Sequence, residues 1–181
     1  MPLRSICVFG SAREGRDPLF VEMAEQTGQL LADHHIKMVY GGARSGLVGV
    51  AASACLSAGG QVVGVRAQPA AEDLACHPDL TATYRTATRG ARKQLMADFA
   101  DGFLVLPGGI GTLDELFEMV SGNQLGLHTK PCVLLDVNGF WTPLIGWLQE
   151  VQRAGLLTGG KSPRLLVAPS PKHALLALSG T

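Results

Sequence analysis

Short apolar segments alternate with amphipathic segments along almost the whole chain, and this alternation limits the folds that are open to it. The short segments have the length of buried strands, whereas the longer ones repeat apolar residues at helical spacing. We expect strands at 5–10, 36–42, 61–66, 81–84, 102–107, 131–137 and 164–168. We expect helices at 18–32, 46–58, 89–100, 112–125, 141–154 and 171–178, with a loop at 67–80. The alternation predicts right-handed crossovers, and therefore an α/β fold with a doubly wound, mainly parallel sheet and helices on both faces.

The 181 residues predict a single domain, 1–181, because no linker, repeat or low-complexity segment divides them. The formal net charge is zero, so we expect neither nucleic acid nor a membrane surface as a partner. No apolar run approaches the ~20 residues of a membrane helix, and the first apolar stretch is too short for a signal peptide. These features favour a cytoplasmic protein. Only 17% of the residues are charged, a balance that a buried subunit interface would explain.

The cysteines and histidines are scattered along the chain and form no metal-binding motif. No C-x-x-C pair and no H-E-x-x-H segment is present. We therefore predict no metal site, and we expect Cys7, Cys55, Cys76 and Cys132 to be reduced, buried thiols.

Three of the expected strands end in glycine, at Gly10, at Gly41-Gly42 and at Gly108-Gly109. In an open parallel sheet, ligands bind beyond the carboxyl ends of the strands. One glycine pair after a strand is usually a turn, but three such ends in one sheet indicate a site. Gly10, Ser11 and Gly42 are therefore candidate substrate-binding residues.

None of these glycine loops fits the common nucleotide motifs. The dinucleotide motif G-x-G-x-x-G is absent, and so is the G-x-x-x-x-G-K-[ST] motif of nucleoside triphosphatases. The G-x-S-x-G motif of serine hydrolases is absent as well, so the sequence does not predict that class of enzyme. A nicotinamide cofactor and a P-loop are both disfavoured, and we expect no cofactor.

The segment P-G-G-I-G-T, which opens the helix expected at 112–125, fits an anion. Its glycines allow close backbone approach, and the first N–H groups of a helix lack intrahelical acceptors. We predict that Gly108, Gly109, Ile110, Gly111 and Thr112 bind a phosphate monoester. An alternative has equal weight on the residues alone. Thr112 to Glu115 reads T-x-x-E, a capping box in which the glutamate returns to the Thr112 amide.

Basic residues crowd the start of the helix expected at 89–100, where Arg89, Arg92 and Lys93 follow Arg85. Cations at a helix N-terminus are unfavourable by a few tenths of a kcal/mol each, roughly, unless an anion accompanies them. One interpretation is a solvated basic turn. The other is that Arg92 and Lys93 face a substrate phosphate or a carboxylate such as Glu115.

Two linked motifs resemble the Lonely-Guy family of phosphoribohydrolases, which is often labelled lysine-decarboxylase-like. They are R-K-x-x-M, with Arg92, Lys93 and Met96, and P-G-G-x-G-T-x-x-E, from Pro107 to Glu115. The segments VFGS (8–11), VYGGxxxGLxG (39–49) and QLGxHxKP (124–131) match as well. The resemblance covers about residues 5 to 160.

This resemblance implies a Rossmann-like fold, a homodimer with its sites near the subunit interface, and hydrolysis of the N-glycosidic bond. The substrates would be nucleoside 5′-monophosphates, such as isopentenyladenosine monophosphate or AMP, and the products a free base and ribose 5-phosphate. Carried over, Arg92 and Glu115 are the catalytic pair, and Gly108 to Thr112 hold the phosphate. Such bonds break through an oxocarbenium-like state, which a carboxylate near the ribose stabilises.

Some positions depart from the family pattern, namely Arg89, Asn123 and the pair Arg66-Ala67, and they put the base specificity in doubt. Pyridoxal-dependent decarboxylation is disfavoured, because Lys93, the lysine of the R-K-x-x-M motif, sits beside an arginine near a helix start. Two alternatives to the hydrolase remain. One is a non-catalytic carrier of a nucleotide or of molybdenum cofactor, and the other is a nucleotide sensor.

Overall fold

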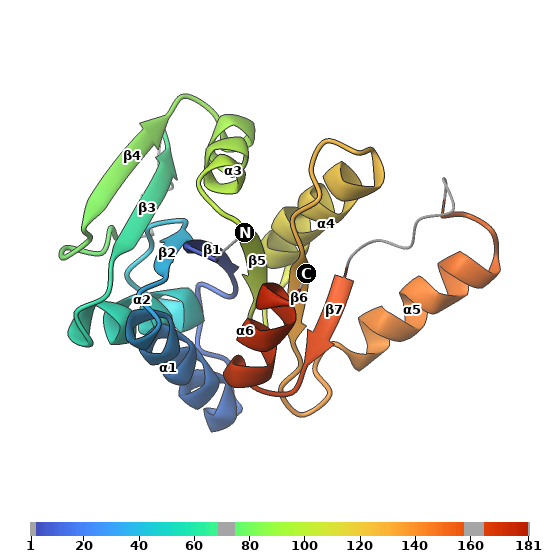
Figure 1. Ribbon diagram of the computed structural model, residues 1–181, viewed down its shortest axis with the longest axis horizontal. Coiled ribbons are helices and arrows are strands. Elements are labelled where there is room, and N and C mark those ends of the chain that lie inside the picture. Colours follow the sequence, from blue (N-terminus) through green and yellow to red (C-terminus); the bar gives the residue numbers. More distant parts are fainter. Residues whose placement is uncertain (1–2, 69–74, 158–164, 181) are drawn as a thin grey trace.

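The computed structural model describes residues 3–68, 75–157 and 165–180, and its elements follow the predicted order (Figure 1). The strands are β1 (Ser5–Phe9), β2 (Lys37–Tyr40), β3 (Val62–Ala67), β4 (Ala82–Thr86), β5 (Gly102–Val105), β6 (Cys132–Leu135) and β7 (Leu165–Ala168). The helices are α1 (Pro18–Asp33), α2 (Gly46–Ser57), α3 (Arg89–Asp98), α4 (Ile110–Gln124), α5 (Thr142–Arg153) and α6 (Pro171–Ser179). Of the loop expected at 67–80, residues 69–74 lie outside the described ranges.

The strands form one sheet in the order β4-β3-β2-β1-β5-β6-β7, and all the pairings between its described strands are parallel. This confirms the doubly wound fold. The strand order reverses at β1, which pairs with β2 on one side and with β5 on the other. In such sheets the crevice at the reversal is the usual ligand site. The loops after β1 and β5 carry the predicted Gly10 and Gly108, so the sheet brings these two loops together.

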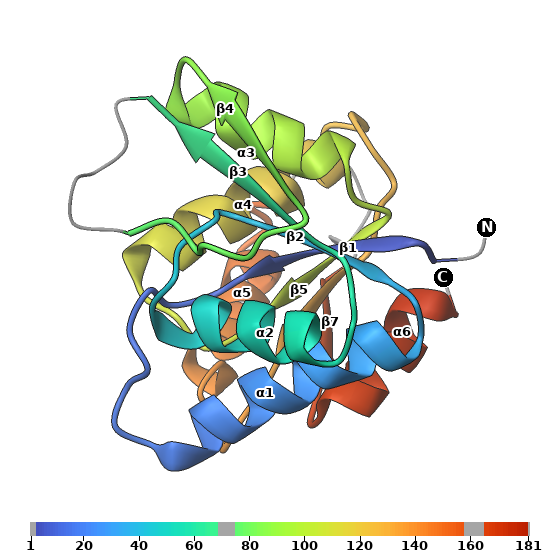
Figure 2. The ribbon, with the colours of Figure 1, turned by 90° about the vertical axis from the view of Figure 1, so that its left-hand side faces the viewer.

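Helices cover both faces of the sheet (Figure 2). Along β1 the side chains alternate between two buried clusters, because successive residues of a strand point to opposite faces. Ile6 and Val8 belong to the cluster that α1, α2 and α6 cover. Cys7 and Phe9 belong to the cluster that α3, α4 and the start of α5 cover. The site residues predicted on α3 and α4 therefore share one face of the sheet.

Small residues allow α1 and α2 to approach each other closely. A Cβ atom at Gly28 would overlap the backbone oxygen of Ala51 on α2. The sequence 46–58 predicted such close packing, although the observed neighbour is helix α1 as well as the sheet.

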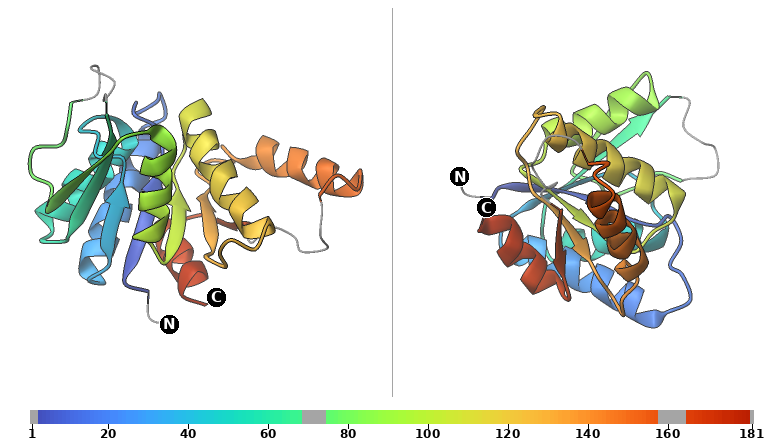
Figure 3. Two further views of the ribbon diagram at one scale, coloured as in Figure 1. Left: turned by 90° about the horizontal axis from the view of Figure 1, so that it is seen from above. Right: turned by 90° about the vertical axis from the view of Figure 1, so that its right-hand side faces the viewer.

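Helix α5 differs from the others because none of its residues is buried. It extends away from the body of the molecule beyond β7 (Figures 1 and 3). Its apolar side chains include Trp147, which is 55% exposed. The Trp147 ring contacts Phe117 of α4, at 6.2 Å between ring centroids. The name α4–α5 face is used here for Phe117 and Trp147 together with the exposed residues Leu125 and Leu127, which follow α4, and Leu156, which follows α5.

Three of the four cysteines are free and buried as expected, but Cys76 is exposed, so the expectation is wrong for that residue. It lies outside the sheet, in a loop that contacts Ala43 through an isolated bridge. Every helix in the described part of the chain is too short or too polar to cross a membrane. Residues 3–68, 75–157 and 165–180 include no group of three or more His, Cys, Asp or Glu side chains placed to hold a metal ion.

Candidate active site

Helix α4 begins two residues earlier than predicted, at Ile110, and this decides between the two interpretations of T-x-x-E. Its N-cap is Gly109, which provides no side-chain hydrogen bond. Thr112 is therefore inside the first turn and cannot cap it, so the capping-box interpretation is wrong. Glu115 instead faces Arg92 of α3.

The glycines of this loop have different surroundings. A Cβ atom at Gly108 would overlap the side chain of Thr112, which is only 3% exposed. At Gly109 and Gly111, by contrast, a Cβ atom would meet no described atom within 4 Å. Neither has a positive φ. Close packing thus explains Gly108, whereas the space at Gly109 and Gly111 is open and lies beside the first N–H groups of α4. Between them, Ile110 is 83% exposed.

The loop after β1 is fixed to the loop after β5. The Ser11 amide donates to the Pro107 carbonyl at 3.1 Å, and the Ser11 carbonyl accepts from the Val48 amide at 3.4 Å. A Cβ atom at Gly10 would lie 2.9 Å from Cβ of Leu106, so Gly10 permits this close approach. Gly10 and Ser11 therefore lie beside the glycine loop, as predicted from the strand ends.

Arg92 and Glu115 come together across the carboxyl end of the sheet. The Arg92 Nη2 atom lies 3.5 Å from Oε1 of Glu115, and both side chains are mostly buried, at 22% and 14% exposed. The Arg92 Nε donates to the Val65 carbonyl at 3.0 Å, which aims the guanidinium. A Cβ atom at Gly41 would overlap Nη2, so Gly41 forms the surface on which the guanidinium lies. The expectation that Arg92 faces Glu115 is confirmed.

Burial raises the pKa of Glu115 to about 7, although the positive charge of Arg92 opposes this shift. The nearby Asp114 carboxylate raises this pKa further, whereas Arg89 and Lys93 lower it. A carboxylate with such a pKa exchanges its proton near neutral pH, which suits a group that takes part in proton transfer or stabilises a cation.

The other cations at the start of α3 pair with acidic residues of α4 rather than with the glycine loop. The Lys93 ammonium contacts Asp114 at 3.1 Å and also contacts Glu118. Arg89 lies 3.9 Å from Asp114, and both of these side chains are exposed. The interpretation of a merely solvated basic turn is therefore wrong for Arg92 and Lys93. The structure brings Arg92 to Glu115, whereas it pairs the Lys93 ammonium with Asp114 and Glu118.

Sequence reasoning missed several contributors to this arrangement. Gly41 was part of the noted glycine pair, yet its contact with Arg92 depends on the packing of α3 over β3 and β4. The Val65 carbonyl carries no side-chain signal at all. Gly42 was predicted, and it takes a φ of +74°, which explains a glycine there.

Known proteins are similar to this chain over most of its length. A family model described as "possible lysine decarboxylase" matches residues 48–178. A cytokinin riboside 5′-monophosphate phosphoribohydrolase of Rhodococcoides fascians is 39% identical over 176 residues, which cover 97% of this chain and 89% of that protein. The rice (Oryza sativa subsp. japonica) protein of the same name is 33% identical, with 97% and 72% covered.

Solved structures show the same fold at lower identity. The molybdenum cofactor binding protein of Rippkaea orientalis has a TM-score of 0.74 and 20% identity, with 99% of this chain and 98% of that chain covered. A molybdenum cofactor carrier protein of Chlamydomonas reinhardtii has a TM-score of 0.71 and 21% identity, with 99% and 97% covered. These two likenesses concern the fold alone. From the extent of the family match and the identity to curated relatives, the chain belongs to the Lonely-Guy family of cytokinin riboside 5′-monophosphate phosphoribohydrolases.

Proposed function

We propose that this protein hydrolyses the N-glycosidic bond of nucleoside 5′-monophosphates, such as isopentenyladenosine monophosphate or AMP, to a free base and ribose 5-phosphate. The observation that carries the proposal is the buried contact between Arg92 and Glu115. It lies at the carboxyl end of the sheet, beside the open glycine loop that begins α4. The names of the relatives support the same reaction.

In this proposal the phosphate occupies the open space at Gly109 and Gly111, where side chains would stand in its way. The first N–H groups of α4 and the positive end of its dipole favour an anion there. Ile110 supplies one of these amides, and Thr112 fixes the loop through its contact with Gly108. Gly10, Ser11 and Gly42 border the same crevice. Anchoring the phosphate positions a remote part of the substrate, which lowers the entropic cost of reaching the transition state.

Glu115 would then act on the ribose. As its carboxylate it stabilises the positive charge that develops at the anomeric carbon while the base departs with the electron pair of the C–N bond. It accepts a proton from the water that attacks this carbon, and this proton passes on to the departing base. Arg92 orients the carboxylate and keeps its pKa lower than burial alone would set it. A carrier needs no carboxylate beside its bound anion, so the retention of this pair favours an enzyme over a carrier or sensor.

The state of Lys93 bears on the decarboxylase label. Although burial lowers its pKa, hydrogen bonds and charges from Glu118 and Asp114 outweigh this effect and raise the pKa above the ordinary value. A Schiff-base lysine must be a free amine to attack a carbonyl group. The pairing therefore disfavours pyridoxal chemistry at Lys93. Lys93 also remains a candidate for substrate binding, but its ammonium would have to leave two carboxylates to reach a phosphate.

We also propose that the protein is a homodimer that buries the α4–α5 face. Trp147, Leu127 and Leu156 are each more than half exposed on this face. Several exposed large apolar side chains on one part of a chain are typical of an interface. Since α4 also carries Glu115, such an interface would lie near the site.

Incubation of the pure protein with AMP and with isopentenyladenosine monophosphate, followed by separation of the products, tests the function. We expect free base and ribose 5-phosphate from the wild type, and bound nucleotide without product from Glu115→Gln. Nucleotide binding without any free base in the wild type would identify a carrier or a sensor instead. Full turnover by Glu115→Gln would refute the role of that residue.

A further inference from the structure

The turn after β2, at Gly41 to Ala43, forms the surface on which the Arg92 guanidinium lies. A Cβ atom at Gly41 would overlap Nη2, the same atom that faces Glu115. The position of this turn therefore controls how closely Arg92 can approach Glu115. Whatever fixes the turn also fixes the pair.

Arg66, near the end of β3, holds this turn from the opposite side of the sheet. Its Nη1 donates to the Gly42 carbonyl at 3.3 Å. Its stem packs on the turn so tightly that a Cβ atom at Gly42 would lie 3.1 Å from Cγ and 3.4 Å from Cδ of Arg66. The same carbonyl accepts from the His77 amide at 3.1 Å. The long side chain of Arg66 thus provides both packing and a charged donor at one point of the turn.

Adjacent residues of β3 therefore restrain Arg92 in two ways. The Val65 carbonyl accepts from the Nε of Arg92 at 3.0 Å, and the Val65 side chain lies on the face that α3 covers. The next residue, Arg66, points to the other face and fixes the turn beneath the guanidinium, because successive strand residues alternate. One short segment thus sets both the direction of the Arg92 side chain and the surface on which it rests.

We propose that Arg66 is a positioning residue: by clamping the Gly41–Gly42 turn, it holds the Arg92 guanidinium against the Glu115 carboxylate. The inference rests on the proposed function only in assigning a reaction to that pair. It gives a physical role to a position where this sequence departs from the family pattern.

Loss of the clamp has a definite electrostatic consequence. If the turn relaxes, Nη2 of Arg92 moves away from Oε1 of Glu115, and the positive charge of Arg92 then stabilises the Glu115 carboxylate less. Burial then acts with less opposition and the pKa of Glu115 rises. A rate that depends on ionised Glu115 would need a higher pH to reach its plateau.

The test uses Arg66→Met, which retains an unbranched stem on Gly42 but removes the donor. The matched control is Arg85→Met. Arg85 is the register partner of Arg66 on β4, is exposed, and carries the same charge. Arg66→Lys serves as the conservative variant, since it keeps the charge and one donor group. The Glu115 carboxyl is titrated by carbon NMR, with Glu115→Gln used to assign the signal, and kcat and KM for AMP are measured against pH.

For Arg66→Met we expect the Glu115 midpoint and the acid limb of kcat to rise by about half a pH unit. We expect kcat at pH 7 to fall about tenfold, with KM within about twofold. Arg66→Lys should recover part of both effects, and Arg85→Met should match the wild type.

An unshifted midpoint in folded Arg66→Met would overturn the proposal, and so would an equal shift in Arg85→Met. If Arg66→Met does not fold, the Glu115 titration is measured in Arg66→Lys instead. We then expect a smaller rise of the Glu115 midpoint, and an unchanged midpoint would overturn the proposal. If the wild type releases no base, the proposed function fails, while the NMR titration still decides the role of Arg66.

Discussion

At the scale of single residues, Glu115 is placed where burial and charge oppose each other. Its pKa of about 7 lies above the ordinary value of 4.5, so the folded chain binds this proton more tightly than the unfolded chain. The stability that Glu115 contributes is therefore greatest at low pH, falls as the pH rises from about 4.5 to about 7, and is lowest above that. The site retains an energetically unfavourable carboxylate, which is typical of catalytic groups.

The raised pKa of Glu115 gives a prediction for the stability of Glu115→Gln. The amide removes the cost of a buried carboxylate, so at pH 8 the variant should unfold at a higher temperature than the wild type. The gain is at most on the order of 3 kcal/mol, and it should vanish below about pH 4.5. Thermal unfolding at pH 8 and at pH 4 measures it. A variant that is less stable than the wild type at pH 8 would show that Arg92 outweighs burial.

Gly111 gives a second prediction at this scale, because no described atom explains why it is a glycine. In a helix, Gly111→Ala should raise stability by about 0.5–1 kcal/mol. If the phosphate binds in the space beside it, the same change should raise KM for AMP severalfold. Gly146→Ala in α5 is the matched control, since its Cβ also meets no described atom within 4 Å. It should give the stability gain with unchanged KM. An unchanged KM for Gly111→Ala would place the phosphate elsewhere.

At the scale of elements, periodicity predicted the order and type of the helices and strands, because each apolar pattern reports on one local face. The prediction from the sequence was wrong at the start of α4. The side chains of Thr112 and Glu115 suggested a cap that does not form, because the N-cap is Gly109, which has no side chain. The contacts between α3 and α4 could be predicted only in part from the sequence. The motifs indicated Arg92 and Glu115, but nothing local to Lys93 indicates that Asp114 and Glu118 would be its partners.

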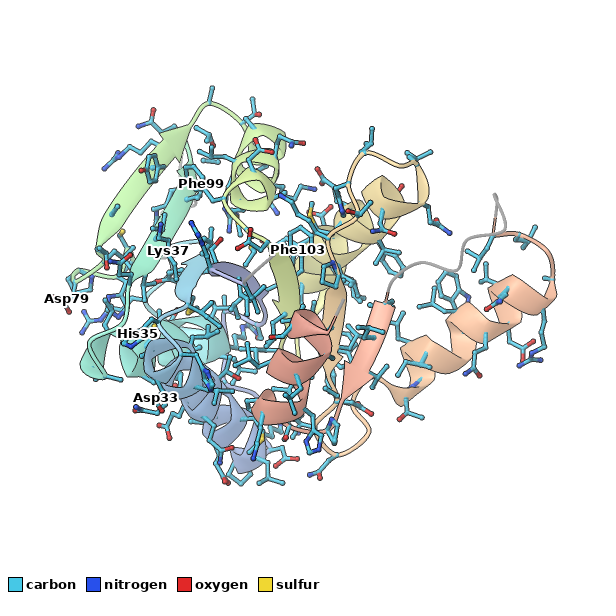
Figure 4. All side chains as sticks on the ribbon, viewed as in Figure 1. Asp33, His35, Lys37, Asp79, Phe99 and Phe103 are labelled. Carbon is cyan, nitrogen blue, oxygen red and sulfur yellow. The ribbon has the colours of Figure 1, made fainter. Side chains whose placement is uncertain are left out.

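Helix α3 is held at two points, and this separates two roles for Lys93. At its C-terminal end, Phe99, which is labelled in Figure 4, packs on Tyr84 of β4 at 4.9 Å between ring centroids. Near the middle of α3, Lys93 joins the helix to Asp114 and Glu118 of α4, whose side chains are more than a third exposed.

If Lys93 acts mainly as this link, Lys93→Met should lower the free energy of unfolding by about 1 kcal/mol or less. The KM for AMP should then stay within about twofold of the wild type. Chemical denaturation and steady-state kinetics measure the two effects. Glu118→Gln is the control, because it weakens the link without removing a cation from the crevice. A large rise in KM for Lys93→Met alone would place its ammonium on the substrate phosphate.

At the scale of the whole molecule, helix α4 connects the reversal of the strand order with the α4–α5 face. It begins just after β5, which pairs with β1 at the reversal, and its Phe117 contacts Trp147 of α5. Leu144 and Ile145 of α5 pack against the core, but none of the residues of α5 is fully buried, so the apolar side of this amphipathic helix is only partly covered in the monomer. A second copy placed there would bury this side and restrain α4, and with it Glu115.

We therefore expect Trp147→Glu to shift the protein from dimer to monomer, because a charge at the centre of a buried apolar interface is unpaired and costly. Light scattering coupled to size-exclusion chromatography measures the mass. Gln149→Glu is the control, since it adds the same charge to an exposed position of α5 about 200° around the helix from Trp147. It should leave the mass unchanged. The monomer should also lose kcat for AMP if restraint of α4 contributes to catalysis. A wild type that is already monomeric at micromolar concentration would contradict the dimer, and an unchanged kcat in a monomeric Trp147→Glu variant would show that the site is complete in one copy.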